Sequence, residues 1–402
     1  MIYTAQPGAR TGTVTPPVSK SIAHRKLICA ALSGPQCIVD CGPAEELSAD
    51  ITATKACLSA LLSGGKVLPC GESGSTLRFL LPVAAALGVD VSFHMEGLLP
   101  HRPHKELTDQ LALHGAVIRR EGSEMFCNGQ ITAGEYTVPG GVSSQFVSGL
   151  LFALPLLKGD STITIEGKLE SAAYVAMTEQ AVTEAGIRVI RKDNGFFIPG
   201  GQKYRAKAEE SVERDWSGAA FGLCLGGFSD KGITVSGLRP DSLQGDRRIL
   251  DILAGFGAEI KKEKDGILVK RGAEMKPQTI DASEIPDLVP VISVFAAGIK
   301  GETRITHAER LRFKESDRLA TTEALIRSLG GTAEQTEDGL RITGRGFLTG
   351  GTVNPAKDHR IAMSAAVAAA ICSEPVVILD AECAGKSYPG FYKDFERLEV
   401  TG

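Results

Sequence analysis

Two patterns of hydrophobic and polar positions recur along the chain. The first is an alternating strand, a polar loop, an amphipathic helix, a glycine, and two strands joined by a turn. Three copies are plain, at 162–198, 234–269 and 304–342, and a fourth, at 91–127, lacks the Asp-Gly or Asn-Gly turn. The glycines that end these helices recur at nearly equal spacing, at Gly115, Gly186, Gly257 and Gly331. The chain is therefore predicted to be built from repeated units.

The second pattern is a helix that is almost wholly apolar after a polar start. It occurs six times, at 19–34, 73–88, 143–159, 215–227, 286–301 and 358–374. A helix that is apolar on all sides is buried, and six buried helices need six covering units. The pattern predicts an α/β fold of two globular halves, each with three repeats, in which the apolar helices lie inside and mixed sheets lie outside.

Length, charge and cysteine usage narrow the class of protein. At about 150 residues per domain, 402 residues predict two to three domains, and a formal net charge of -4 argues against a nucleic-acid-binding domain. The longest apolar stretches, 289–299 and 361–372, are shorter than the roughly 20 residues that span a bilayer. The N-terminus lacks a secretory pattern, and nine cysteines without a CxxC pair fit a reducing cytosol. We expect a cytoplasmic globular protein that binds neither nucleic acid nor membrane.

Polar side chains concentrate where the apolar helices begin. Ser or Asp at each start fits an N-cap. The starts carry more than one cap side chain requires: Lys20, Ser21 and Arg25; Gly74, Ser75 and Arg78; Ser143, Ser144 and Gln145; Asp287; His359 and Arg360. A helix N-terminus carries roughly +0.5 of an elementary charge, and its N–H groups bind phosphate or carboxylate. If several such ends face one cleft, that cleft attracts small anionic metabolites.

Each motif also has a purely structural interpretation. SKSIAHR at 19–25 fits a capped surface helix, and GESGSTLRF at 71–79 fits a tight turn and is not a Walker loop. Arg102 in LLPHRPHKEL fits a solvated side chain, as does Lys386 in AGKSYPGFY. RLRFKESDRL at 310–319 fits an exposed helix in which Glu315 reaches Arg318 at i, i+3. DHR at 358–360 is harder to explain this way, because charge at a buried helix start needs a partner.

Taken together and in order, these segments resemble the 5-enolpyruvylshikimate-3-phosphate synthase family from about residue 4 to 394. The resemblance implies an inside-out α/β fold of two domains, 18–214 and 1–17 plus 215–402, with the active site in the cleft between them. It implies transfer of the enolpyruvyl group of phosphoenolpyruvate to the 5-hydroxyl of shikimate 3-phosphate, in the pathway to chorismate and the aromatic amino acids. It also implies a monomer that needs no organic cofactor and no obligatory metal.

The resemblance assigns roles position by position. Lys20 matches the residue that touches both substrates, and Gln145 lies near both ligands. Shikimate 3-phosphate would be held by Ser21, Arg25, Ser143, Ser144, Ser171, Tyr174 and Lys314. Phosphoenolpyruvate would be held by Gly74, Arg102, Arg318, Arg360 and Lys386. Asp287 matches the proton acceptor at the 5-hydroxyl, and Glu315 matches the proton carrier at the enolpyruvyl methylene.

The chemistry itself requires such groups. A weakly acidic alcohol must lose a proton while C3 of the enol ether gains one, and each positioned carboxyl group contributes about 10²- to 10⁴-fold in rate. Lys20 and Lys386, placed near the transferring carbon and the departing phosphate, would stabilise charge in a tetrahedral intermediate.

The chain departs from the family pattern at Glu72, Phe79 and Arg310, where the family often has other residues. Glu72 is expected to point away from the anion site or to pair with a cation, and sensitivity to the competitive inhibitor glyphosate stays open. The nearest rival family, UDP-N-acetylglucosamine enolpyruvyl transferase, typically has a reactive Cys in the segment 95–102, where this chain has none. A non-catalytic anion-binding protein is a second alternative, but Asp287, Glu315 and Lys386 are all present.

Overall fold

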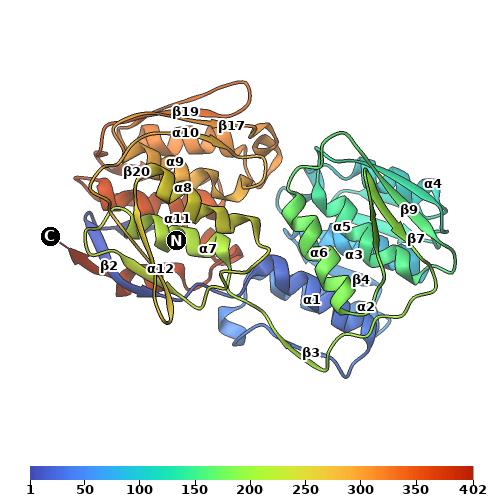
Figure 1. Cartoon of the computed structure of the whole chain (residues 1–402). Helices are drawn as coiled ribbons and strands as arrows, with labels where there is room; N and C mark the ends of the chain where they lie inside the picture. The colour runs from blue at the N-terminus through green and yellow to red at the C-terminus, as the bar shows by residue number, and fades with distance from the viewer. Residues whose placement is uncertain (402) are drawn as a thin grey trace. The chain divides into compact units, whose positions relative to one another are not determined.

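The computed structural model describes residues 1–401, which form two compact units. The N-terminal unit comprises Lys20–Pro43 and Leu47–Val212. The C-terminal unit comprises Met1–Ser19, Ala44–Glu46 and the chain from Glu213 onward. The main chain passes from one unit to the other after Ser19 and after Val212 (Figure 1), and between these points the short segment Ala44–Glu46 also belongs to the C-terminal unit.

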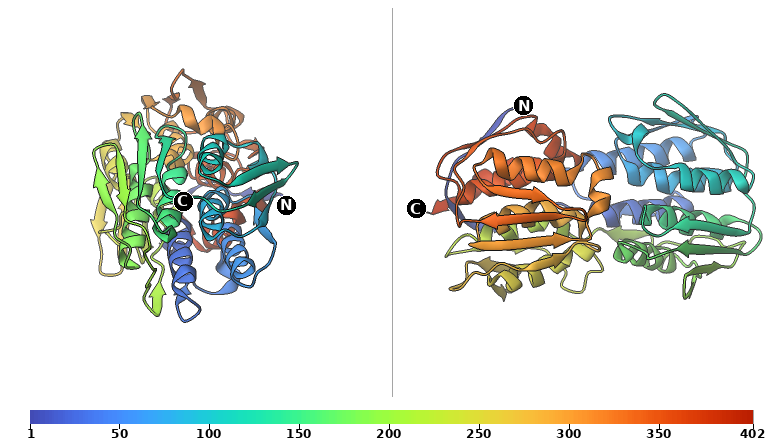
Figure 2. Two further views of the ribbon diagram at one scale, coloured as in Figure 1. Left: turned by 90° about the vertical axis from the view of Figure 1, so that its right-hand side faces the viewer. Right: turned by 90° about the horizontal axis from the view of Figure 1, so that it is seen from above.

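The N-terminal unit contains six helices and ten strands among its described residues. The helices are α1 (Lys20–Ser33), α2 (Ala49–Leu62), α3 (Gly74–Leu87), α4 (Lys105–Leu113), α5 (Ser144–Ala153) and α6 (Ala172–Glu184). The strands are β3 (Ile38–Asp40), β4 (Val67–Gly71), β5 (Val91–Met95), β6 (Val117–Glu121), β7 (Glu124–Asn128), β8 (Glu135–Pro139), β9 (Ser161–Glu166), β10 (Ile190–Lys192), β11 (Gly195–Ile198) and β12 (Glu209–Ser211). In the left view of Figure 2, the blue and cyan helices of this unit lie between its green and teal sheets.

The C-terminal unit likewise contains six α-helices among its described residues. They are α7 (Trp216–Gly226), α8 (Ile249–Phe256), α9 (Val289–Ala297), α10 (Arg318–Ser328), α11 (His359–Ala368) and α12 (Phe391–Arg397). Its strands are β1 (Tyr3–Ala5), β2 (Ala9–Val14), β13 (Ile233–Ser236), β14 (Glu259–Lys262), β15 (Gly266–Lys270), β16 (Thr279–Asp281), β17 (Gly301–Thr306), β18 (Thr332–Gln335), β19 (Leu340–Gly344), β20 (Gly351–Val353), β21 (Val376–Ile378) and β22 (Glu399–Thr401).

The sheets confirm the repeated architecture. Four of them share one order, in which a parallel pair of strands is followed by an antiparallel hairpin: β4-β5-β7-β6, β8-β9-β11-β10, β2-β13-β15-β14 and β16-β17-β19-β18. The third also carries β22 against β2. The other two sheets are reduced, since β3 pairs only with β12 and β1-β21-β20 has three strands. The prediction of six covering units holds, but only four have the full strand set.

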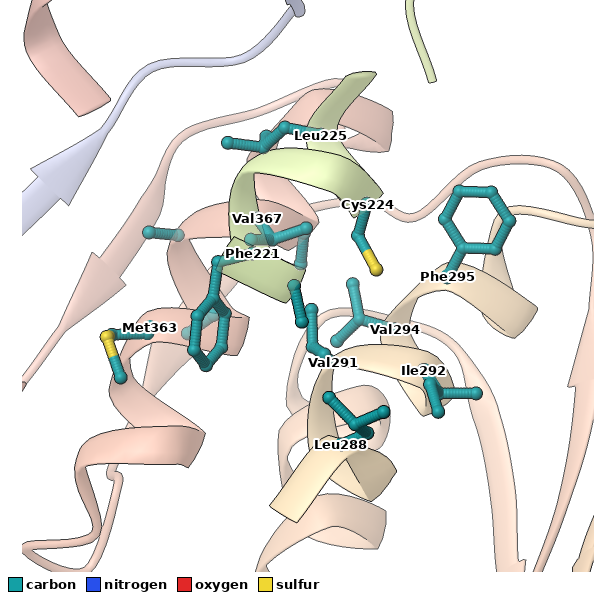
Figure 3. Packing of buried hydrophobic residues seen from close by; sticks show 14 of the residues in the cluster. Phe221, Cys224, Leu225, Leu288, Val291, Ile292, Val294, Phe295, Met363 and Val367 are labelled. Carbon is teal, nitrogen blue, oxygen red and sulfur yellow. The ribbon is translucent and has the colours of Figure 1, made fainter. Parts of the chain in front are cut away.

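The apolar helices form the cores. Every residue of α7, α9 and α11 is buried, and Figure 3 shows side chains from all three helices in one hydrophobic cluster, among them Phe221, Phe295 and Met363. Helices α3 and α5 are buried along almost their whole length. Helix α1 departs from the prediction, because only about one face of it is buried, where it packs on α2 and α6.

The polar helix starts act as caps at four of the six apolar helices. Ser73, Ser143, Asp215 and Asp358 each accept a backbone N–H through the side chain. The expectation was wrong for Asp287, because Leu288 occupies the cap position of α9 and no side chain caps that helix. The carboxylate of Asp287 instead forms ion pairs with Arg318 and Arg360. No helix in residues 1–401 has both the length and the apolar character to cross a membrane.

Candidate active site

In the N-terminal unit, α1 runs parallel to α2, and α3 runs parallel to α5. On α1 and α2, Lys20 pairs with Asp50 at 2.9 Å, and one turn further along both helices His24 contacts Thr54. On α3 and α5, Ser75 contacts Gln145 near both helix starts, and Pro82 lies beside Gly149 further along both helices. Parallel neighbours place several positive helix ends together, where they favour negative charge.

An anion cradle lies at the start of α3. Ser73 Oγ accepts the N–H of Thr76, and Ser73 O accepts that of Leu77. The N–H groups of Gly74 and Ser75 have no acceptor among the described residues. A Cβ atom placed on Gly74 would lie 3.1 Å from Nη1 of both Arg102 and Arg78, so two guanidinium groups converge on the same helix end. We define the anion cradle as the two N–H groups with Arg102.

Gln145 ties α5 to this cradle. Arg78 Nη1 donates to Gln145 Oε1 at 2.7 Å, and Gln145 Nε2 donates to Ser75 Oγ at 2.9 Å. Ser143 caps α5, and Ser144 is buried at its first position. The structure thus brings together Gly74, Arg102, Ser143, Ser144 and Gln145.

Arg25 is a buried cation without a carboxylate partner in residues 1–401. Its guanidinium donates to Thr178 Oγ1 at 2.8 Å, to Ser21 O at 2.5 Å and to Tyr174 O at 2.7 Å. Burial lowers the pKa of Arg25 to about 10. A buried charge needs compensation, so this position is suited to an anionic ligand.

Ser171, beside this group, has strained backbone. It is the residue before α6 and is 3% exposed, and its φ of 55 lies in the left-handed region. Such a conformation costs a non-glycine residue about 1–3 kcal/mol and persists where the surroundings impose it, often at functional sites. Its carbonyl accepts the N–H of Tyr174 at 3.0 Å, which keeps the two predicted ligand residues together.

The C-terminal unit gathers carboxylates around Arg318, which is only 1% exposed. Its guanidinium contacts Asp287 at 2.7 Å, Glu315 at 2.8 Å and Asp358 at 2.8 Å, and Arg360 contacts Asp287 at 3.0 Å. We call Asp287, Glu315 and Asp358 the carboxylate cluster. Burial alone would raise the pKa of Asp287, but Arg360, Lys314 and Arg318 hold that pKa well below its usual range. Asp287 is therefore ionised at neutral pH.

Lys314 lies beside this cluster. Burial lowers its pKa to about 8, and the nearby charges of Arg310 and Arg318 act in the same direction while Asp287 opposes them. Lys386 ends a 3-10 helix, Ala381–Lys386, that packs against α11. The structure brings Asp287, Lys314, Glu315, Arg318 and Arg360 into one group.

One interpretation needs correction. The segment KESDR is not an exposed helix, because α10 begins only at Arg318 and that side chain is buried. The carboxyl group of Glu72 lies against Gly97. Phe79 is buried beneath the Arg25 guanidinium, 5.2 Å from the ring centroid, and Arg310 donates to Ser283 O.

The sequence interpretation gave no site role to three residues that complete these groups. Asp50 pairs with Lys20, Arg78 joins Gln145 to the anion cradle, and Asp358 pairs with Arg318. Asp358 carried a usable signal, because a charge at a buried helix start needs a partner. Asp50 did not, because α2 is not one of the apolar helices. No group of three or more His, Cys, Asp or Glu suited to a metal ion occurs among the described residues.

Comparison with solved structures identifies the fold class. EPSP synthase from Acinetobacter baumannii matches over 100% of both chains with a TM-score of 0.78 and 24% identity. The enolpyruvyl transferase NikO from Streptomyces tendae matches over 100% of this chain and 97% of its own, with a TM-score of 0.75 and 16% identity. The fold is therefore that of the enolpyruvyl transferases, as the sequence predicted.

Sequence comparison identifies the family. Residues 4–395 match the model for EPSP synthase (3-phosphoshikimate 1-carboxyvinyltransferase). A protein of that name from Clostridium kluyveri is 42% identical, covering 96% of this chain and 95% of the relative. One from Clostridium acetobutylicum is 39% identical, with the same coverage of both chains. The chain belongs to the EPSP synthase family, which confirms the resemblance.

Proposed function

We propose that this protein transfers the enolpyruvyl group of phosphoenolpyruvate to the 5-hydroxyl of shikimate 3-phosphate and releases phosphate. The family match over nearly the whole chain supports this reaction. The structural observation that carries it is the division of charge: the N-terminal unit holds a buried guanidinium and an anion cradle, and the C-terminal unit holds two anchored carboxylates. Two anionic substrates and two proton-transfer groups require this combination.

In this proposal the N-terminal unit binds most of the shikimate 3-phosphate. Arg25 and Lys20 receive its negative charge, and hydroxyl and amide groups bind the remaining polar atoms: Ser21, Ser143, Ser144, Gln145, Ser171 and Tyr174. Gly74 and Arg102 receive phosphoenolpyruvate, together with Arg318, Arg360 and Lys386 from the other unit. Lys314 contacts shikimate 3-phosphate.

Asp287 accepts the proton of the 5-hydroxyl as the hydroxyl oxygen attacks C2 of phosphoenolpyruvate, while Glu315, in its protonated form, protonates C3. A C3 proton then returns to the Glu315 carboxylate as the bond from C2 to the phosphate oxygen breaks, and the proton on Asp287 leaves with the phosphate. Ion pairs with Arg318 and Arg360 make Asp287 a weak base in the free enzyme. An anionic ligand on these guanidinium groups shares their charge and raises the pKa of Asp287 toward that of an effective base.

Replacement of either carboxylate tests this proposal. Asp287→Asn and Glu315→Gln retain the side-chain size and one accepting oxygen each, so Arg318 can keep a hydrogen-bond acceptor at each position while proton transfer is lost. We expect phosphate release from phosphoenolpyruvate and shikimate 3-phosphate to slow by about 10²-fold or more in turnover. Asp241→Asn, at an exposed carboxylate paired with Arg239, is the matched control.

Unchanged turnover in Asp287→Asn or Glu315→Gln would remove that residue from the mechanism. Activity of the wild-type protein with UDP-N-acetylglucosamine instead of shikimate 3-phosphate would favour the rival family. We further propose that the enzyme works in the cytoplasm, which its nine free cysteines support, and that it is a monomer. Light scattering tests the oligomeric state, because a monomer has the mass of one chain, 42.4 kDa.

A further inference from the structure

Four buried polar side chains connect α1, α2 and α3 inside the N-terminal unit. His24 Nδ1 lies 2.6 Å from Thr54 Oγ1, Thr54 Oγ1 lies 2.6 Å from Thr76 Oγ1, and Thr76 Oγ1 donates to Ser73 Oγ at 2.7 Å. None is more than 1% exposed. We call His24, Thr54, Thr76 and Ser73 the polar bridge. It begins beside Arg25 and ends on the residue that caps the anion cradle.

The hydrogen atoms of the polar bridge can be arranged in only one direction. The Thr76 hydroxyl has one hydrogen, which it donates to Ser73, so Thr76 accepts from Thr54. Thr54 has then used its own hydrogen and accepts from His24. The donor on His24 must therefore be Nδ1–H. In a neutral imidazole the other nitrogen, Nε2, is then unprotonated, which agrees with its lack of a hydrogen-bond partner among the described residues.

The surroundings of His24 keep the ring neutral and fixed. Burial lowers its pKa to about 3; Asp50 opposes this shift, while Lys20 and Arg25 reinforce it. The ring packs edge-on against Phe79, with centroids 6.3 Å apart, and the Arg25 guanidinium lies over the same Phe79 ring. One end of the polar bridge is thus locked to the residues proposed to bind shikimate 3-phosphate.

The other end sets the geometry of the anion cradle. Ser73 Oγ accepts both the Thr76 hydroxyl and the Thr76 N–H, so the first turn of α3 is tied to Thr54 on α2. Gly74 and Ser75, whose N–H groups form the anion cradle, lie between Ser73 and Thr76, so this hydrogen bond fixes the backbone on both sides of them. Consecutive buried hydrogen bonds restrain the segments that they join, and backbone N–H groups that are displaced or tilted bind an anion less strongly. Apolar side chains could fill the same core but would not set this orientation.

We propose that His24, Thr54, Thr76 and Ser73 are positioning residues that orient the first turn of α3 for phosphoenolpyruvate. They touch neither substrate and act through the backbone N–H groups of the anion cradle. This inference rests on the proposed function, because it names the ligand that the cradle receives.

Thr54→Val tests the inference at the middle of the polar bridge, since valine keeps the shape of threonine and removes its hydroxyl. We expect KM for phosphoenolpyruvate to rise about tenfold, while KM for shikimate 3-phosphate and kcat change less than twofold. Thr54→Ser restores the hydroxyl and should return KM toward the wild-type value. Thr303→Val, at a buried threonine of β17 whose hydroxyl has no partner among the described residues, is the matched control.

An unchanged KM for phosphoenolpyruvate in folded Thr54→Val would overturn the inference, as would an equal rise of both KM values. A second measurement tests the polar bridge in the wild-type protein, so it does not depend on the folding of Thr54→Val. Nitrogen-15 spectra of the wild-type protein, with the His24 signal identified by its loss in His24→Asn, should show the Nδ1–H tautomer without titration between pH 5 and 8. The Nε2–H tautomer, or titration near pH 6.5, contradicts the polar bridge. Absence of turnover in the wild type would contradict the proposed function alone.

Discussion

The charge of Lys314 responds to mildly alkaline pH. Its pKa is lowered to about 8, chiefly by burial, so it is protonated at pH 7 and loses its proton as the pH rises through 8. The groups that act on it are Asp287, Glu315, Arg310 and Arg318. If Lys314 binds the phosphate of shikimate 3-phosphate, kcat/KM for that substrate should fall above pH 8 by about tenfold per pH unit.

Lys314→Arg provides the control for this pH profile. Arginine stays protonated throughout the accessible range, so the decline above pH 8 should disappear even if the absolute kcat/KM is lower. Steady-state rates between pH 6.5 and 9.5 measure both profiles. A decline that persists unchanged in Lys314→Arg would assign the titration to another group.

At the residue scale, the sequence could predict only contacts between near neighbours. The pair Glu315–Arg318 follows from i, i+3 spacing and is present at 2.8 Å. The pair Arg318–Asp358 joins residues far apart along the chain, and nothing in local spacing indicates it. The motifs that the sequence marked nevertheless gather within each unit, because helices that run in parallel bring their polar starts to the same end.

At the scale of elements, α7 depends on glycine to approach the sheet. A Cβ atom on Gly226 would lie 2.4 Å from Val269 O and 3.0 Å from Ile233 N, both backbone atoms that cannot move aside. Gly226→Ala should therefore destabilise the C-terminal unit by about 1–3 kcal/mol, although alanine gains about 1 kcal/mol in helix propensity. Thermal unfolding followed by Trp216, the single tryptophan, which is buried at the start of α7, measures the change.

Gly222→Ala is the comparison within the same helix. Its Cβ atom would meet side-chain methyl groups, Val14 Cγ2 at 2.8 Å and Val235 Cγ2 at 3.2 Å, which can shift by small rotations. We expect a smaller loss of stability than in Gly226→Ala. The reverse order would show that the backbone contact of Gly226 does not limit the approach of α7.

The elements themselves were largely predictable because helix periodicity is local, whereas their pairing was not. All six apolar helices form where the sequence placed them. The half-exposed α1 escaped prediction because its small residues, such as Ala31, are as compatible with a surface as with a core. The pairing of Ala9–Val14 with Glu399–Thr401 could not be predicted, because the register between strands distant in sequence leaves no local pattern.

At the scale of the whole molecule, the chain segments at Ser19 and at Glu213, where the chain changes unit, meet at one side chain. Gln244 Oε1 accepts Ser19 Oγ at 2.9 Å and Trp216 N at 3.0 Å, and its Nε2 donates to Glu213 Oε1 at 2.7 Å and Arg214 O at 2.9 Å. All four hydrogen-bonding positions of the amide are thereby used. Backbone bonds from Ser19 N to Glu213 O and from Asp215 N to Pro17 O hold the same two segments together.

Gln244→Glu should loosen this junction, because the new carboxylate oxygen would face the Glu213 carboxylate and the Arg214 carbonyl instead of donating to them. Leaving such buried groups unsatisfied costs about 1–3 kcal/mol, so amide exchange at Ser19 and Trp216 should accelerate by about 10- to 100-fold. Turnover should also fall, because Lys20 follows Ser19 directly. Gln278→Glu, at a side chain that donates to Ile252 O, should leave these two amides unchanged. Equal exchange in Gln244→Glu and the wild type would show that the backbone bonds alone hold the two segments.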